Sequence, residues 1–206
     1  AAIDVKYGDF SCDKMASKNS SLTLGYGNAN ITEVNELIAD LKYSNMTLGT
    51  ANDLNLTTKY SNFKLNKVKN LKVDSGYDNY KIEEVSSAII ETKYTPVKIG
   101  KVDQSLDITN KYGSIQIGNI DRKVNALSFS LGYTDLKINI PSDVSYEFDI
   151  TAKYGSIILP KNITTNIRNR EKSGSTTYVK GTAGSGTPTL KLDATNSYSD
   201  INITAK

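Results

Sequence analysis

The chain contains 206 residues, of which 38% are apolar, and its 25 basic and 22 acidic side chains give a net charge of +3. So low an apolar fraction disfavours one large compact core and fits an elongated repeat array, in which each repeat buries only a thin inner stripe. The small, evenly spread charge excludes a dedicated nucleic-acid surface, and no apolar run reaches the roughly 18 residues of a membrane-spanning helix.

A tyrosine recurs along the chain at nearly constant intervals, mostly 17 to 21 residues long. Each one is followed by two apolar residues separated by one other residue, as in residues 59–65 (KYSNFKL) and 111–117 (KYGSIQI). Self-similarity at one short period predicts a repeat architecture. The recurring residues are Tyr7, Tyr26, Tyr43, Tyr60, Tyr77, Tyr94, Tyr112, Tyr133, Tyr154 and Tyr198.

Residues 1–119 form the regular part of this pattern. Apolar residues recur six and four positions before each tyrosine and three and five positions after it, which indicates strands with one face turned inward. The inward parity changes across the tyrosine, so a corner there must absorb one residue, and the small residues that follow it suit a turn. A further apolar residue about eight positions after the tyrosine predicts a third, shorter side.

Coils of this kind stack by pairing their strands in parallel. We therefore predict an all-β fold, a single-stranded right-handed parallel β-helix (β-solenoid) with 17–21 residues per coil and roughly eleven coils. A helical alternative fails, because no segment sustains apolar residues at the i, i+3, i+4 and i+7 spacing over three turns.

The later part of the chain is less regular. Residues 120–159 predict longer coils, residues 160–189 an irregular coil rich in Gly, Ser and Thr, and residues 190–206 a closing coil. Strand alternation resumes in the same register, so we expect one domain over residues 1–206. The chain begins within a strand-like repeat, and we expect a signal segment or earlier coils to precede it.

Cys12 is the only cysteine, which excludes an intramolecular disulfide. It occupies the second apolar position after Tyr7, where other coils carry Ile or Leu. This placement predicts a buried thiol that packs in the core rather than a reactive one.

The repeated Lys-Tyr-Gly-x-Φ-x-Φ segment, where Φ is apolar, resembles that of an adhesin-type β-solenoid family of bacterial envelope proteins. The segment occurs at residues 6–10 (KYGDF) and 153–157 (KYGSI), and the order of segments over 141–201 is similar too. The resemblance covers essentially the whole chain. It implies a β-solenoid exported to the periplasm, outer membrane or cell surface, and it supplies no catalytic residues.

Two outward rows are candidate ligand-binding surfaces. Three lysines lie four positions after successive tyrosines and could hold acidic glycans or anionic headgroups: Lys64, Lys81 and Lys98. Their tyrosines, Tyr60, Tyr77 and Tyr94, could offer an aromatic platform to sugars or peptides. The alternatives are a solvated basic face and a tyrosine column that only stabilises the corner.

Catalytic chemistry finds little support in the sequence. Histidine is absent, which removes the commonest general base and metal ligand, and single acids on separate coils predict neither a metal site nor a cofactor. The acids near the irregular end show no spacing that dictates a pair: Asp121, Asp135, Asp143, Glu147, Asp149 and Glu171.

We therefore expect a non-enzymatic, adhesin-like binding or structural module of the bacterial cell envelope. Its partners would be envelope or host glycans or a protein, and neither nucleic acid nor a membrane-spanning segment is expected. The alternatives are a polysaccharide-active β-helix enzyme and a purely structural envelope scaffold.

Overall fold

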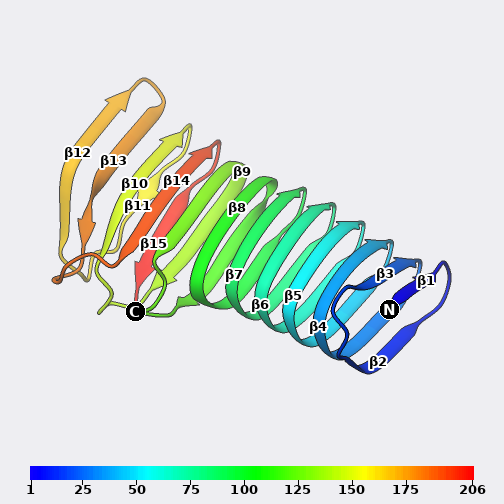
Figure 1. Ribbon diagram of the computed structural model, residues 1–206. Coiled ribbons are helices and arrows are strands. Elements are labelled where there is room, and N and C mark those ends of the chain that lie inside the picture. The colour runs from blue at the N-terminus through cyan, green and yellow to red at the C-terminus, as the bar shows by residue number, and fades with distance from the viewer.

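The computed structural model describes residues 1–206 and is all-β: strands without a single helix form a stack of coils around one axis (Figure 1). All the strands belong to one 15-stranded sheet. They are β1 (Ala2–Val5), β2 (Phe10–Met15), β3 (Ser20–Gly25), β4 (Asn28–Lys42), β5 (Asn45–Lys59), β6 (Asn62–Gly76), β7 (Asn79–Lys93), β8 (Val97–Ile120), β9 (Ala126–Ile140), β10 (Tyr146–Lys153), β11 (Ile157–Ile158), β12 (Thr165–Ser173), β13 (Thr176–Ala183), β14 (Leu190–Ser197) and β15 (Ile201–Ala205). No helix is present that could cross a membrane.

Neighbouring coils pair in parallel, which confirms the predicted β-solenoid. From β4 to β7 each paired residue lies over the residue 17 positions further along, as Asn28 does over Asn45 and Ile31 over Leu48. The stack completes about eight turns. The spacing of the tyrosines predicts more coils than this. That count includes incomplete coils and also residues 160–189, which form a hairpin and do not wind around the axis. The right-handed sense of the winding stays a prediction from strand twist.

The core is one continuous column of apolar side chains inside the coils. From the second coil onward the predicted inward rows are buried, as at Leu56 and Phe63, which are at most 2% exposed. The exceptions are Ile157 and Leu159, which are partly buried near the C-terminal end of the stack. In the first coil the same rows are only partly buried, because β1 and β2 pair with other strands on one side only. Cys12 belongs to this coil, so the thiol is half-buried against the core rather than fully buried as predicted.

The corner that the sequence requires is made by the tyrosine itself. Every recurring tyrosine from Tyr26 onward has a positive φ, between 51° and 64°. This left-handed conformation reverses the strand alternation, so the residue after the tyrosine points inward. A Ser or Thr at that position donates its hydroxyl hydrogen to the carbonyl two residues back, as Ser61 does to Lys59 (3.0 Å) and Thr95 to Lys93 (2.9 Å). On these coils the hydroxyl stabilises the corner from inside, whereas Gly27, Asp78 and Gly113 take the position on others.

The C-terminal part departs from the order of the sequence. β14 lies between β9 and β10, and β15 lies between β9 and β11, so the coil of residues 190–206 inserts into the stack instead of closing it. The prediction of a closing coil was wrong in this respect. Parallel strands pair equally well with either neighbour in the stack, so chain order alone does not fix their spatial order.

Residues 160–189, expected to form an irregular coil, instead carry the β12–β13 hairpin. β13 pairs antiparallel with β10, and β12 forms the outermost strand of the stack (Figure 1). Gly174, with φ 57°, lies in the turn between them. β12 is almost entirely exposed, carries Arg168, Arg170 and Lys172, and has an irregular register at residues 167–169. Charges and a bulge on an edge strand discourage pairing with another chain, so the hairpin caps this end.

Candidate functional site

The tyrosines stack into one continuous ladder along the corner of the solenoid. Ring centroids of neighbouring members lie 4.5–5.4 Å apart, and the side chains are 42–79% exposed. The order follows the stack rather than the chain, because Tyr198 lies between Tyr133 and Tyr154. The ladder therefore runs through the inserted C-terminal coil without a break.

The three tyrosines singled out in the sequence, Tyr60, Tyr77 and Tyr94, occupy consecutive steps of this ladder. Their centroids are 5.0 and 4.6 Å apart, with the planes inclined by 20° and 8°. Each ring face is thus covered by the ring above or below, and solvent meets only ring edges and hydroxyls. A sugar ring cannot stack on a face that is already occupied, so the ladder stabilises the corner and is not a flat aromatic platform.

An asparagine ladder runs beside the tyrosines on the next side of the coil. Asn45 Nδ2 donates to Asn28 Oδ1 (2.9 Å), and Asn62 Nδ2 donates to Asn45 Oδ1 (3.0 Å). Asp9 Oδ1 accepts from Asn28 at the N-terminal end of the row (2.8 Å). Because these amides bond one another, they hold neighbouring coils in register.

The lysine row lies beyond the asparagines. Lys64 pairs in register with Lys81, and Lys81 with Lys98, so the structure brings the three predicted residues together on adjacent coils. Lys81 forms an ion pair with Glu83 (2.7 Å), and this contact lowers the pKa of the Glu83 carboxyl. Lys64 and Lys98 form no ion pair. A shallow depression of about 230 Å³ lies over Lys64, Lys81 and the neighbouring Thr47.

A second set of lysines, which the sequence reasoning missed, flanks the tyrosine ladder on its other side. These residues directly precede a tyrosine and are exposed. Lys59 Nζ lies 5.4 Å from the ring centroid of Tyr60, within reach of a cation–π contact. The Lys-Tyr pairs in the sequence are the signal that could have identified this row. Its members include Lys42, Lys59, Lys93 and Lys111, and Gly76 interrupts the row between Lys59 and Lys93.

One buried acid lies inside the corner beneath the ladder. Asp78, only 4% exposed, takes the position that Ser or Thr holds on other coils. Its carboxylate accepts from the Ser61 amide (2.6 Å) and the Thr58 hydroxyl (2.7 Å), and Thr58 Oγ1 lies 2.6 Å from the hydroxyl of Tyr80. Burial raises the pKa of Asp78 above its ordinary value. All four residues of this network are buried, so it is a structural element.

Insertion of β14 brings together two acids that are distant in sequence. Asp193 pairs in register with Asp149 of β10. Asp149 accepts hydrogen bonds from Lys180 (3.0 Å) and from the hydroxyl of Tyr178 (3.2 Å), and Asp193 forms an ion pair with Lys191 (2.7 Å). The bond to Asp149 raises the pKa of Lys180. Lys180 thus joins β13 to β10, and Lys191 pairs with Asp193 within β14, so each carboxylate already has its own cation.

No group of three or more Cys, Asp or Glu side chains in the structure could hold a metal ion.

Comparison with known proteins identifies the family of the chain. No curated protein and no solved structure matches the chain. The family model of Toastrack DUF4097 matches residues 1–204, and the fold of that family is likewise β-helix-like. The stacked coils, the tyrosine corner and this match over nearly the whole length agree: the chain belongs to the Toastrack DUF4097 family.

Proposed function

We propose that this protein is a non-catalytic, adhesin-like binding module of the bacterial cell envelope that holds an extended acidic glycan along its axis. The observation that carries the proposal is the register of Lys64, Lys81 and Lys98, one lysine per coil. Two of the three lack an acidic partner, and a second lysine row lies across the tyrosine ladder.

A rigid row of this kind suits a polymer better than a small ligand. Neighbouring coils are about 4.8 Å apart, so the lysines offer evenly spaced positive charges that a chain of repeated carboxylates can meet several at a time. A single exposed ion pair contributes only about 0–1 kcal/mol, but linked contacts add through effective concentration. The exported location implied by the family resemblance would place such polymers within reach.

Polygalacturonate, a linear acidic glycan, tests the proposal. The Lys64→Glu/Lys81→Glu/Lys98→Glu variant should lose about tenfold or more of the affinity for polygalacturonate, because three contacts become repulsive. The melting temperature should stay nearly unchanged, since all three side chains are exposed. Affinity of the native chain should also fall as salt is added.

The matched control places the same charge change elsewhere. Lys18, Lys69 and Lys123 are exposed, form no ion pair and lie outside both rows. Their triple change to Glu should reduce the affinity by only about two- to threefold through the net charge. Equal losses in the two triple variants would refute the lysine row. Release of reducing sugar would instead identify an enzyme, and absence of binding a scaffold.

A further inference from the structure

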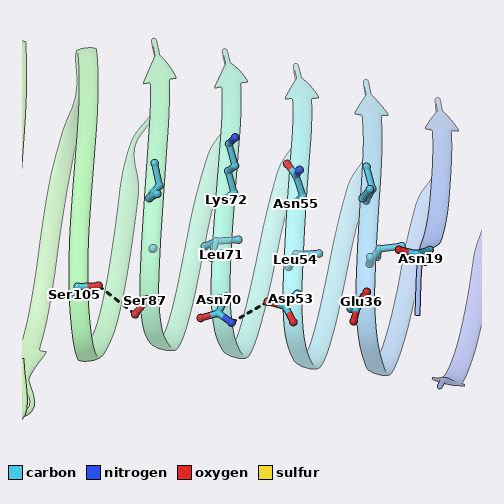
Figure 2. A pocket seen from close by; sticks show the side chains of 14 residues that line it. Asn19, Glu36, Asp53, Leu54, Asn55, Asn70, Leu71, Lys72, Ser87 and Ser105 are labelled. Atoms are coloured by element: carbon cyan, nitrogen blue, oxygen red, sulfur yellow. Dashed lines mark hydrogen bonds between the residues drawn. The ribbon is translucent and has the colours of Figure 1, made fainter. Parts of the chain in front are cut away.

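A groove of the molecule lies away from the lysine row. Its volume is about 580 Å³, and it runs along the axis across successive coils from Asn19 to Ser105 (Figure 2). On each coil the short side separates it from the lysine row; Lys64, for example, precedes that side and Leu71 follows it. The groove is therefore a distinct surface.

One polar side chain per coil forms the wall of this groove. Asp53 lies over Asn70, whose Nδ2 donates to Asp53 Oδ1 (2.8 Å), and Ser105 Oγ lies 3.1 Å from Ser87 Oγ (Figure 2). Glu36 pairs in register with Asp53 and forms no ion pair. Hydrogen-bond acceptors thus recur at the coil spacing along one line, with carboxylate oxygens left over at Glu36 and Asp53.

The other row of the groove is mixed: in register along the axis it runs Ile38, Asn55, Lys72 and Ile89, so it is apolar at its two ends. Ile38 is 60% exposed and Ile89 is 51% exposed, although both lie within strands, and together with the edges of Leu54 and Leu71 they line the groove. Outside the tyrosine ladder, the only other exposed large apolar side chains are Ile158 and Ile167. Two exposed isoleucines in one groove offer apolar contact to a ligand.

We propose that this groove binds a neutral glycan chain that lies parallel to the solenoid axis. Sugar hydroxyls would donate to Glu36 and Asp53, and the C–H faces of the sugars would contact Ile38 and Ile89. The repeat of about 4.8 Å per coil is close to the length of one hexose in an extended β-linked chain. The groove contains two carboxylates, Glu36 and Asp53, and one cation, Lys72. It therefore has no electrostatic attraction for the acidic glycan that we assign to the lysine row.

An extended peptide fits this surface less well. Peptides that add to a sheet use a free strand edge, whereas the strands beneath the groove are hydrogen-bonded to neighbours on both sides. The groove also crosses the strands instead of following them (Figure 2). A repeating hydroxyl-rich chain meets the wall once per coil without requiring any backbone donor from the protein.

Titration with two probes tests this assignment: the β-1,4-linked hexamer of glucose and that of N-acetylglucosamine. At least one hexamer should bind in calorimetry, more tightly than its dimer, because the groove spans several coils. The Ile38→Glu/Ile89→Glu variant should lose about tenfold or more of that affinity, through repulsion of the apolar sugar face by charge. Polygalacturonate binding should stay within about twofold of the native value, since only the net charge changes, and this separates the test from that of the lysine row.

The chain supplies a matched control. Ile158→Glu/Ile167→Glu changes the two exposed isoleucines outside the groove and should leave hexamer affinity within about twofold of the native value. Circular dichroism should show the same strand signal in both double variants. Failure of both hexamers to bind, equal losses in the two variants, or tighter binding of an extended peptide would overturn the proposal.

Discussion

At the scale of single residues, the tyrosine corner combines a backbone cost with a stacking gain. A left-handed conformation costs a residue other than glycine about 1–2 kcal/mol. Tyr60, with φ 55°, adopts it while its ring stacks on Tyr43 and Tyr77, each at 5.0 Å. Each stack contributes about 0.5–1.5 kcal/mol, so the two contacts together offset the backbone cost.

This balance predicts different effects for two truncations of Tyr60. Tyr60→Ala removes both stacks and keeps the unfavourable φ, whereas Tyr60→Gly removes the stacks and relieves the backbone. Urea unfolding should therefore show both variants destabilised, with the Ala variant less stable than the Gly variant by about 1 kcal/mol. Equal stabilities, or a more stable Ala variant, would contradict the idea of a strained corner held by stacking.

Asp78 predicts a particular dependence of stability on pH. Burial raises the pKa of its carboxyl in the folded chain above the ordinary value of 3.8, so the folded state binds more protons than the unfolded state above that pH. The contribution of Asp78 to stability is therefore complete below pH 3.8 and is lost as the pH rises through the folded-state pKa.

An Asp78→Asn variant isolates this effect. The amide oxygen can still accept from the Ser61 amide, and the amide hydrogens can donate to Thr58. In urea unfolding from about pH 3.5 to 7, the free energy of unfolding of the native protein should fall relative to that of the variant as the pH increases. A difference independent of pH would show that the buried carboxyl does not titrate as predicted.

At the scale of elements, the C-terminal end shows how the solenoid is closed. β10 is bonded to β14 on one side and to β13 on the other, so the hairpin covers the last parallel strand. Register pairs continue along the whole of β10, from Tyr146 with Ala183 to Lys153 with Thr176. An uncovered β10 would present a row of free backbone donors and acceptors to another chain.

Replacement of residues 161–187 with a short Gly-Ser linker removes this cap. The shortened chain should keep its parallel coils but associate as concentration rises, through its exposed β10 edge, in sedimentation velocity experiments against the full chain. Adding Thr151→Lys to the shortened chain should weaken the association, because a further charge then lies on the edge beside those of Glu147, Asp149 and Lys153. An oligomeric state equal to that of the full chain at every concentration would contradict the capping role.

At the scale of the whole molecule, the rigid rod presents different chemistry on different sides. The tyrosine ladder lies between two lysine rows, and the groove of Glu36 and Asp53 lies beyond the short side. The row of Lys64, Lys81 and Lys98 and the polar wall of the groove repeat at the coil spacing, so each suits a long polymer more than a small molecule. The two proposed ligands, one acidic glycan and one neutral glycan, would then lie along the same rod on separate sides.

The sequence alone determined the structure of a single coil, because apolar residues alternate with period two and every coil repeats the same pattern around its tyrosine. From the spacing of Tyr43, Tyr60 and Tyr77 follow the parallel register, the inward rows and the stacking of Lys64 on Lys81. These are local patterns that stacking simply repeats, and a single sequence displays them in full.

Only the tertiary structure decided what depends on neighbours distant in the chain. Parallel coils are interchangeable in pairing, so nothing local predicts that β14 lies between β9 and β10 or that Asp193 meets Asp149. The same holds for the tyrosine faces, which are covered only once the rings stack, and for the groove, whose lining residues come from successive coils. Sequence periodicity determines the structure of one coil, and long-range strand pairing determines which coils lie next to each other.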